Sequence, residues 1–380
     1  MKKLLAKVNW HGAPFLVLTP PIGIALTIYH LRTEGFIWQI WVFAAVMYTL
    51  TATSITAGYH RLFAHRAYEA RTWLKVFYAF FGGAAFQNSI FTWCREHRVH
   101  HRFVDTDSDP YSISKGFFWA HFGWMLSSYQ VPVKMESYGR DFERDPIIMF
   151  QHKYYIPIAS FACFVMPMGV GYLLGSWLGG LAVAGLIRMT ALHHNTFFIN
   201  SWCHYFGRQE YTDKNTARSS FIMAVATFGE GYHNFHHIFE GDYRNGIRWY
   251  HWDPTKWMIQ FFRMLGLAYG LKTAPQSEIT RLQLEMDEKR LKGRLSHHWQ
   301  GQFQTQLDSL KVQIHGAQQR FEQLRAEYKK MAKDYAHNQM ERLEELKFQI
   351  RLAKIEFRMG LEQWRAYNSF LLSNALPVRA

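Results

Sequence analysis

Cysteine is scarce in this chain. Cys94, Cys163 and Cys203 are the only three among 380 residues, and they lie far apart with no CxxC spacing. The sequence therefore gives no sign of a disulfide framework. Several catalytic motifs are absent as well: no HExxH, GxSxG or P-loop sequence occurs. Their absence argues against a zinc peptidase, a nucleophile-elbow hydrolase and a P-loop nucleotide hydrolase.

Acidic residues are outnumbered: 29 Asp and Glu stand against 43 Lys and Arg, a formal charge of +14. A basic balance suits nucleic acid, anionic lipid headgroups or an anionic substrate. The apolar segments described next favour the last two, and we expect no nucleic-acid partner. The start of the chain, MKKLLAKVNWHG, lacks the apolar core and cleavage site of a secretory signal. We interpret it as a retained cytoplasmic end.

Long apolar runs, in contrast, are plentiful. Four are long enough to cross a bilayer, which takes about 20 residues: 13–31, 36–58, 154–174 and 177–199. The short links RTEG and GS join them into two helical hairpins. The sequence thus predicts an all-α membrane protein with four transmembrane helices and a cytosolic helical cap.

A fifth apolar stretch, 73–92, contains Lys75, Gln87 and Asn88. If it crossed the membrane, the histidine clusters described below would lie on opposite faces. Because one shared metal site needs these clusters together, we predict that 73–92 is a buried or interfacial helix.

Histidine is clustered in this chain. HRLFAH (60–65) contains two histidines, HRVHH (97–101) and HNFHH (233–237) contain three each, and one more lies at position 204. Residues i, i+3 and i+4 of a helix share a face, so each HxxHH is predicted to direct three imidazoles to one point. Nine imidazoles exceed one tetrahedral zinc site and suit two metal ions. One such cluster could arise by chance, but three on the same predicted membrane face argue against chance. Paired metals with histidine ligands beside a bilayer indicate oxygen activation by iron.

Residues 276–380 differ from the rest of the chain. They are rich in Glu, Gln, Lys and Arg, and apolar or small residues recur every three or four positions from Phe303 to Tyr335. This pattern is a heptad seam, and its register slips near Asn338. We therefore predict a membrane domain at 1–275 and a C-terminal extension at 276–380. The extension would be a long helix or a helical hairpin of coiled-coil type that packs on itself or on a partner.

Three motifs resemble the histidine boxes of membrane fatty acyl-CoA desaturases of the stearoyl-CoA desaturase type: GYHRLFAHRAY (58–68), REHRVHHRFVDTDSDP (95–110) and GEGYHNFHHIFEGDYR (229–244). The resemblance covers about residues 12–270. It implies four transmembrane helices, a cytosolic cap and two Fe ions that use dioxygen to introduce a cis double bond, usually delta-9, into a long acyl chain.

The resemblance also implies site residues. The metal ligands would be His60, His65, His97, His100, His101, His204, His233, His236 and His237, with Asn200 acting through water. Gln87, Trp93 and Thr196 would shape the bend of an acyl tunnel, and Asn88, Arg95 and Glu96 would lie near the CoA headgroup. Tyr48 and Ala52, at i and i+4 of the second span, would close the far end of the tunnel. Glu96 replaces a more familiar Asp and Phe197 a Trp, which weakens the substrate assignments more than the metal assignments.

Ordinary structural roles compete with several of these assignments. Gln87 and Asn88 could cap a helix, Trp93 could pack at the membrane interface, and Tyr48 could belong to an aromatic belt. Asp105, Asp107 and Asp109 lack the Gly and Glu of a calcium loop, so we expect them to orient ligand imidazoles instead.

The main alternative function is a membrane di-iron hydroxylase acting on lipids or alkanes, although its differently spaced first box is absent here. A second alternative is a membrane scaffold with structural metals. For a desaturase we expect a fatty acyl thioester substrate, foremost acyl-CoA, with carrier protein and phospholipid as other possible carriers. We also expect an external electron donor (ferredoxin, rubredoxin or a small cytochrome), contact with membrane lipid, and self-association through the C-terminal helix. The protein should be a multi-pass membrane protein with its site on the cytoplasmic face, in a bacterial inner membrane rather than the endoplasmic reticulum.

Overall fold

The structure is a computed structural model that describes residues 8–10, 12–129, 131–294, 297–333 and 340–374. The predicted register slip at Asn338 and most of the basic N-terminal segment lie outside these residues. The chain forms two compact units, residues 1–209 with 213–273 and residues 210–212 with 274–380. This division falls close to the predicted boundary between residues 275 and 276.

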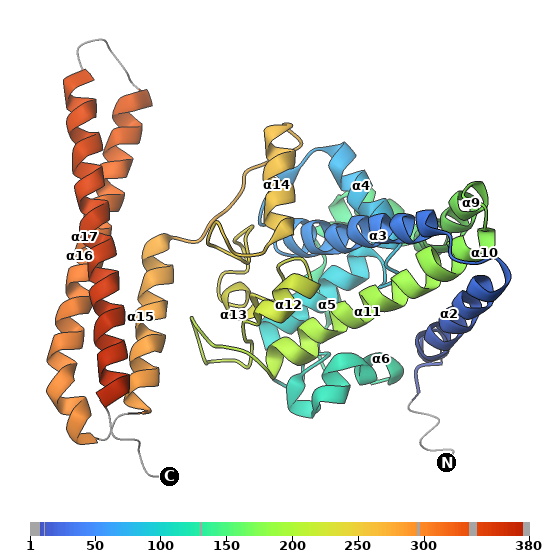
Figure 1. The fold of residues 1–380 in the computed structure, drawn as a ribbon, viewed down its shortest axis with the longest axis horizontal. Coiled ribbons are helices and arrows are strands. Elements are labelled where there is room, and N and C mark those ends of the chain that lie inside the picture. The colour runs from blue at the N-terminus through green and yellow to red at the C-terminus, as the bar shows by residue number, and fades with distance from the viewer. Residues whose placement is uncertain (1–7, 11, 130, 295–296, 334–339, 375–380) are drawn as a thin grey trace. The chain divides into compact units, whose positions relative to one another are not determined.

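The first unit consists almost entirely of helices (Figure 1). Its longer helical elements are α2 (Ala13–Thr33), α3 (Trp38–Thr53), η1 (Ser54–Ala64), α4 (Thr72–Gly83), α5 (Ile90–Phe103), α7 (Pro146–Lys153), α8 (Tyr155–Ser160), η6 (Phe161–Val165), α9 (Met166–Leu173), η7 (Gly180–Ile187), α11 (Arg188–Ser201), α12 (Phe221–Ala226) and α14 (Pro254–Met264). Its short helical elements are η2 (Ile113–Lys115), η3 (Trp119–Gly123), α6 (Trp124–Leu126), η4 (Met135–Tyr138), η5 (Phe142–Arg144), α10 (Trp177–Gly179), η8 (Trp202–His204) and α13 (His233–His236). Strands β1 (Glu69–Ala70) and β2 (Ala268–Tyr269) pair in antiparallel fashion, a small departure from the all-α prediction.

Three helical runs among the described residues are long and apolar enough to cross a membrane: Ala13–Thr33, Trp38–Ala64 and Tyr155–Leu173. They correspond to the first three predicted spans. The fourth predicted span is also helical, because α10, η7 and α11 follow one another from Trp177 to Ser201. Its second half contains Arg188, His193, His194 and Asn195, which lower its hydropathy.

The predicted helix at 73–92 is wrong in its continuity. Helix α4 ends at Gly83, and α5 begins at Ile90 with Ser89 as its N-cap, whose Oγ accepts a hydrogen bond from the amide of Thr92. Phe86 and Asn88, between the two helices, both have positive φ, which a continuous α-helix does not allow. One face of α4 is buried against the rest of the unit, while Trp73 on the opposite face is 80% exposed.

Two close backbone approaches hold the helices around the site. A Cβ on Gly82 of α4 would lie 2.3 Å from the Tyr59 ring of η1, so glycine permits α4 to pack directly on the helix that bears the first histidine box. A Cβ on Gly180 would lie 2.1 Å from the carbonyl oxygen of Pro167, so the hairpin between α9 and η7 depends on glycine too. The main core of the unit surrounds the first of these contacts and includes Ile55, Tyr59, Tyr78, Ile90 and Ile259.

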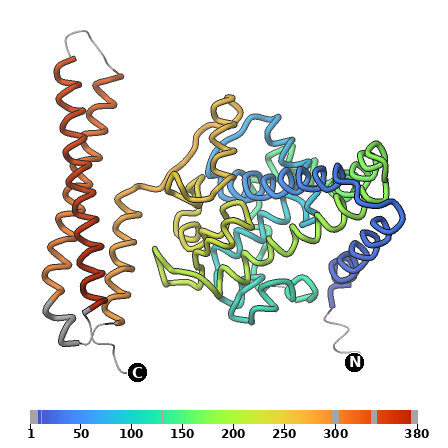
Figure 2. The backbone as a smooth tube through the Cα atoms, in the orientation of Figure 1, coloured from blue at the N-terminus to red at the C-terminus, as the bar shows by residue number. Residues whose placement is uncertain are grey.

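The second unit is a helical hairpin with a third helix beside it (Figure 2). Helices α16 (His297–Lys333) and α17 (Met340–Asn374) form the hairpin, and α15 (Gln276–Lys292) lies along part of it. Its core contains Leu284 and Leu291 of α15, Leu307, Leu310 and Ile314 of α16, and Trp364 and Leu371 of α17. Of the two alternatives left open by the sequence, a single long helix or a hairpin, the structure shows the hairpin.

Candidate metal centre and adjoining cavity

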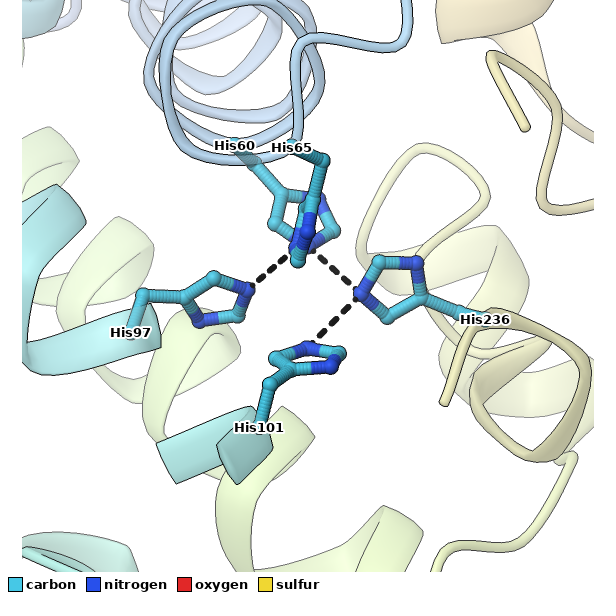
Figure 3. Close-up of side chains that lie close together, drawn as sticks. All are labelled: His60, His65, His97, His101 and His236. Atoms are coloured by element: carbon cyan, nitrogen blue, oxygen red, sulfur yellow. Dashed lines mark hydrogen bonds between the residues drawn. The ribbon is translucent and has the colours of Figure 1, made fainter. Parts of the chain in front are cut away.

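Five histidines converge on one point in the first unit. Figure 3 shows His60 and His65 approaching from one helix, His97 and His101 from α5, and His236 from α13. Their nearest ring nitrogens are 2.8 to 3.0 Å apart: His65 Nε2 to His97 Nε2, His60 Nε2 to His236 Nε2, and His236 Nε2 to His101 Nε2. All five offer a nitrogen within 4.8 Å of the others.

The remaining four predicted ligands form a second group: His100, His204, His233 and His237. His233 Nε2 lies 3.0 Å from both His204 Nε2 and His237 Nε2. The two groups adjoin, since the rings of His101 and His237 stack with centroids 4.3 Å apart. The structure thus brings together all nine histidines selected from the sequence, as two neighbouring clusters.

The expectation that each HxxHH directs three imidazoles to one point is wrong. His97 and His101 belong to the first group while His100 belongs to the second, and His233 and His237 belong to the second while His236 belongs to the first. On a helix, residue i+4 lies about 40° from residue i, whereas i+3 lies about 60° to the other side. Each HxxHH therefore provides an i, i+4 pair to one cluster and a single ligand to the other, which links the two clusters.

The first box depends on an unusual helix. Residues Ser54–Ala64 form a π-helix, and the amide of His65 donates to the carbonyl of His60 at 3.1 Å. In an α-helix, residues i and i+5 lie about 140° apart, but the wider turn of a π-helix brings them onto the same side of the helix. This geometry explains how the HxxxxH spacing delivers both His60 and His65 to the same cluster.

Carboxylates hold the outward-facing nitrogens of several ligands. Glu230 lies 2.9 Å from His60 Nδ1, Asp109 lies 2.9 Å from His100 Nδ1, and Glu240 lies 3.1 Å from His101 Nδ1. His204 Nδ1 contacts the Thr216 hydroxyl at 2.8 Å, and Thr216 in turn donates to Asp105. Such partners fix ring orientation and leave Nε2 free to bind metal.

The aspartates singled out from the sequence therefore differ in position. Asp105 and Asp109 lie behind the imidazoles of the clusters, whereas Asp107 makes contacts through its backbone carbonyl, which accepts from Lys115 and Tyr129.

A buried ionic network behind His60 is not apparent from the sequence. Arg61 donates to Glu230 and, through two nitrogens, to Asp253. Asp253 also accepts from the backbone amides of Asn245, Gly246 and Lys256. Burial raises the pKa of Glu230, but His60 and Arg61 outweigh burial and leave it at about 2. Glu230 is thus a carboxylate that orients His60, and its position within the third motif, three residues before His233, was the only sequence signal for it.

Burial, reinforced by repulsion between neighbouring imidazoles, lowers the pKa of seven of the clustered histidines and so favours their neutral form: His65, His97, His101, His204, His233, His236 and His237. For His101 the value is about 4. Neutral imidazole is the form that binds transition metals.

The clusters fit metal ions better than they fit hydrogen bonding alone. His236 Nε2 lies 3.0 Å or less from two other Nε2 atoms at once, and His100 Nε2 is buried without a hydrogen-bond partner among the described residues. Two nitrogens each about 2.1 Å from one ion, at right angles, are separated by about 3.0 Å. All-imidazole donor sets suit Zn, Cu, Fe and Ni. The geometry supports two adjacent metal sites, with five and four protein ligands.

A cavity of about 800 Å³ opens beside both clusters. His60 and His97 of the first cluster and His233 of the second line it. So do Asn200 and all eight residues assigned to substrate by resemblance: Tyr48, Ala52, Gln87, Asn88, Trp93, Arg95, Glu96 and Thr196.

Polar contacts fix the shape of the middle of this cavity. Gln87 Nε2 donates to Thr196 Oγ1 at 3.0 Å, and this hydrogen bond joins the segment before α5 to α11. Neither Gln87 nor Thr196 is a helix cap, so the alternative role of Gln87 as a cap does not apply. The Trp93 ring stacks on His97 with centroids 4.9 Å apart, so it touches a histidine of the first cluster. Arg95 Nε donates to the carbonyl of Met135, and burial raises the pKa of neighbouring Glu96 to about 7.

The end of the cavity formed by α3 contains one residue that sequence reasoning missed. Asn195 Nδ2 donates to the Tyr48 hydroxyl at 2.5 Å, and the Phe228 ring lies 6.1 Å from the Tyr48 ring. Ala52, one turn further along α3, is buried. Tyr48 is therefore held in place by α11, which distinguishes it from a freely exposed aromatic belt residue.

Comparison with known proteins agrees with this arrangement. Residues 36–272 match the family model described as Fatty acid desaturase. The chain belongs to the fatty acid desaturase family. The matched range contains all nine clustered histidines and ends just before α15, so the second unit lies outside the family core.

Several curated relatives are similar to this desaturase-family chain. It is 45% identical to "Probable acyl-CoA desaturase" of Schizosaccharomyces pombe and 40% identical to "Acyl-CoA desaturase 1" of Saccharomyces cerevisiae, in each case over 74% of this chain. These alignments cover 58% and 56% of the two yeast proteins, so the chain spans little more than half of their length. It is also 39% identical to "Acyl-CoA Delta-9 desaturase" of Acheta domesticus, over 63% of this chain and 68% of that protein.

Proposed function

We propose that this protein is an acyl-CoA desaturase that introduces a cis double bond, at the delta-9 position, into a long acyl chain. The observation that carries this proposal is a single cavity lined at once by histidines of both clusters and by the apolar residues of α3. The family assignment and the names of the three relatives support the same reaction class.

The two clusters would each bind one iron ion. The chemistry that iron supplies there is oxidation: an acyl CH₂–CH₂ pair, dioxygen, two electrons and two protons become CH=CH and two waters. The chain positions the reactants for this oxidation. Nine imidazoles would bind the metals, Glu230, Asp109 and Glu240 set the orientation of three of them, and Asn200 lines the cavity, where it could contact water.

The cavity would hold the acyl chain in a fixed register. Gln87 and Thr196 tie two of its walls together, and Tyr48, which lines the cavity on α3, would stop the chain there. Arg95 and Asn88 would lie near the thioester head, where the cationic side chain suits the phosphates of CoA. The distance between the thioester head and Tyr48 would then determine which carbon of the acyl chain lies next to the metal clusters.

A membrane hydroxylase remains the alternative because it would use the same kind of centre, but the family assignment does not favour it. Mass spectrometry of the product separates the two: desaturation lowers the acyl mass by about 2, and hydroxylation raises it by about 16. The purified protein would be given stearoyl-CoA, acyl-carrier protein and acyl-phospholipid in parallel, with a generic reductase and each candidate electron donor. Failure of all acyl substrates to lose two hydrogens would contradict the proposal.

We further propose four membrane spans, the fourth being Trp177–Ser201, with the metal centre on the cytoplasmic face. The first unit supports one shared face for the centre, because His60 and His204 lie at or near the ends of the helical runs that contain the second and fourth predicted spans. The basic start of the sequence favours the cytoplasmic face. Ferredoxin, rubredoxin or a small cytochrome would deliver electrons from outside. The expectation of a bacterial inner membrane stays a prediction, and the three relatives described above, from two yeasts and a cricket, favour the endoplasmic reticulum instead. We also propose that the second unit mediates self-association.

A further inference from the structure

Helix α17 has two apolar faces. Its inner face packs on α16 and α15, where Leu343, Leu346 and Trp364 are buried. A second series lies on the outside: Phe348 is 59% exposed, Leu352 45%, Ile355 52% and Met359 52%. Isolated exposed apolar residues are ordinary, but four in a row on one helix face require an explanation.

The spacing of the outer residues is that of a coiled-coil seam. Phe348, Leu352, Ile355 and Met359 are separated by steps of four, three and four, which places them at successive d, a, d and a positions. The inner series Leu346, Ile350, Ala353 and Phe357 has the same steps but is displaced by two residues. Two residues correspond to about 200° on a helix, so the outer seam faces away from the hairpin core and is not used within the second unit.

Charges beside the outer seam distinguish between possible partners. Arg351 and Arg358 occupy the g positions on one side, and Glu356 occupies an e position on the other. Glu356 Oε2 also pairs with Arg320 of α16 in the same chain at 3.2 Å, and the Glu356 side chain is 50% exposed. In a parallel pair of identical helices, g of one helix meets the following e of its partner. Arg351 would then lie beside Glu356 of the other copy, twice by symmetry. In an antiparallel pair centred on the same four residues, Arg351 would instead meet Arg358.

We propose that the outer seam of α17, defined as Phe348, Leu352, Ile355 and Met359, binds the same seam of a second copy of this chain in parallel orientation. The interface would have twofold symmetry, as most homodimers have. This inference deepens the self-association proposed above and rests on it. It involves no residue of the metal centre or of the cavity.

The outer seam is short, so the association that it mediates should be weak. The next seam positions on either side are Glu345 and Glu362, so apolar contact is confined to about two heptads. Like carboxylates facing one another across a seam oppose association. We therefore expect weak association in dilute detergent. It should become substantial where a membrane confines both copies and raises their effective concentration.

Disulfide cross-linking of the full-length protein in membranes tests the geometry. The native cysteines are all buried, so single cysteines introduced on α17 report alone. Because a positions meet each other across a parallel seam, Leu352→Cys should form a covalent dimer on mild oxidation. Lys354→Cys, exposed and two residues away on the same helix, should not.

Either of two results would overturn the proposal. If Leu352→Cys stays monomeric and reacts freely with maleimide, the seam is uncovered. If it stays monomeric and is protected from maleimide, another partner or another part of this chain covers the seam. A dimer that forms only when Leu352→Cys and Ile355→Cys chains are mixed would show an antiparallel pair and overturn the orientation.

Equilibrium association of the full-length chain in nanodiscs or dilute detergent gives an independent test. Ile355→Glu should weaken dimerisation at least about tenfold, because it places a charge in the seam. Val312→Glu is the matched control, since Val312 is a 72% exposed apolar residue on α16, and it should have no effect. Arg351→Glu should weaken association, and adding Glu356→Arg should restore it. Glu362→Leu should strengthen association by extending the seam.

Equal dimerisation of Ile355→Glu and the unchanged chain would show that α17 is not the interface. Desaturation and metal content are measured on the same samples. Loss of dimer with full activity supports the interface, and lack of activity in every sample counts against the desaturase proposal alone.

Discussion

Under the proposed desaturase function, Tyr48 and Ala52 should set the length of acyl chain that the protein accepts. Both line the cavity beside the metal clusters, and both lie on α3 one turn apart. Tyr48 is held by the hydrogen bond from Asn195, so its ring cannot swing aside without breaking that bond. A longer acyl chain must therefore stop at the ring.

The magnitude follows from burial of methylene groups. Each CH₂ transferred from water to an apolar site contributes about 0.8 kcal/mol. A ring that denies space to two methylenes thus costs about 1.6 kcal/mol, or roughly fifteenfold in relative kcat/KM. Tyr48→Ala should shift preference towards longer chains by at least this factor. Ala52→Phe, which places a ring one turn nearer the metal, should shift it towards shorter chains.

The assay is competition between acyl-CoA substrates of twelve to twenty carbons, with products resolved by mass spectrometry. Tyr48→Phe is the matched control, because it removes the hydroxyl and the Asn195 contact but keeps the ring; its length profile should change much less than that of Tyr48→Ala. Metal content is checked in each variant, since Ala52 is buried and overpacking costs typically 1–3 kcal/mol. An unchanged length profile in both Tyr48→Ala and Ala52→Phe, with turnover retained, would refute the reasoning.

Four further outcomes are expected. Alanine should abolish turnover, while the protein still inserts into membranes, at any one of four predicted ligands from the two clusters: His60, His100, His204 and His236. Retained turnover in two of these four variants would contradict the proposed metal centre. Glu230→Gln should weaken metal binding about 10- to 100-fold, measured by chelator competition, whereas Asp107→Asn should not. Truncation after residue 275 should leave metal content intact, and an empty centre would place the second unit in the catalytic core. Burial raises the pKa of Glu288, but the ion pairs with Lys292 and Lys311 outweigh burial and lower this pKa to about 2. The ionised Glu288 therefore adds to the free energy of unfolding above about pH 4.5, and this stabilisation is lost as the pH falls towards 2. Glu288→Gln should remove this acid-dependent part of α15 protection in hydrogen exchange of the full-length chain.

The spacing of residues was enough to select most of the histidines that the structure brings together. Histidines at i, i+3 and i+4 could be recognised as candidate ligands because the helical repeat is local and needs no tertiary information. The first three membrane spans follow from composition for the same reason. The heptad steps predicted buried positions such as Leu307, Leu310 and Ile314, which the structure places in the core of the hairpin.

What the tertiary structure decided is how these local units combine. It divided the nine histidines into five and four, because which imidazole meets which depends on how α5, α13 and the π-helix face one another. It also supplied Glu230, Asp253, Thr216 and Asn195, whose roles arise from contacts between residues distant in sequence. A helical period fixes the direction of a side chain relative to its own axis. It does not fix the neighbour towards which that direction points.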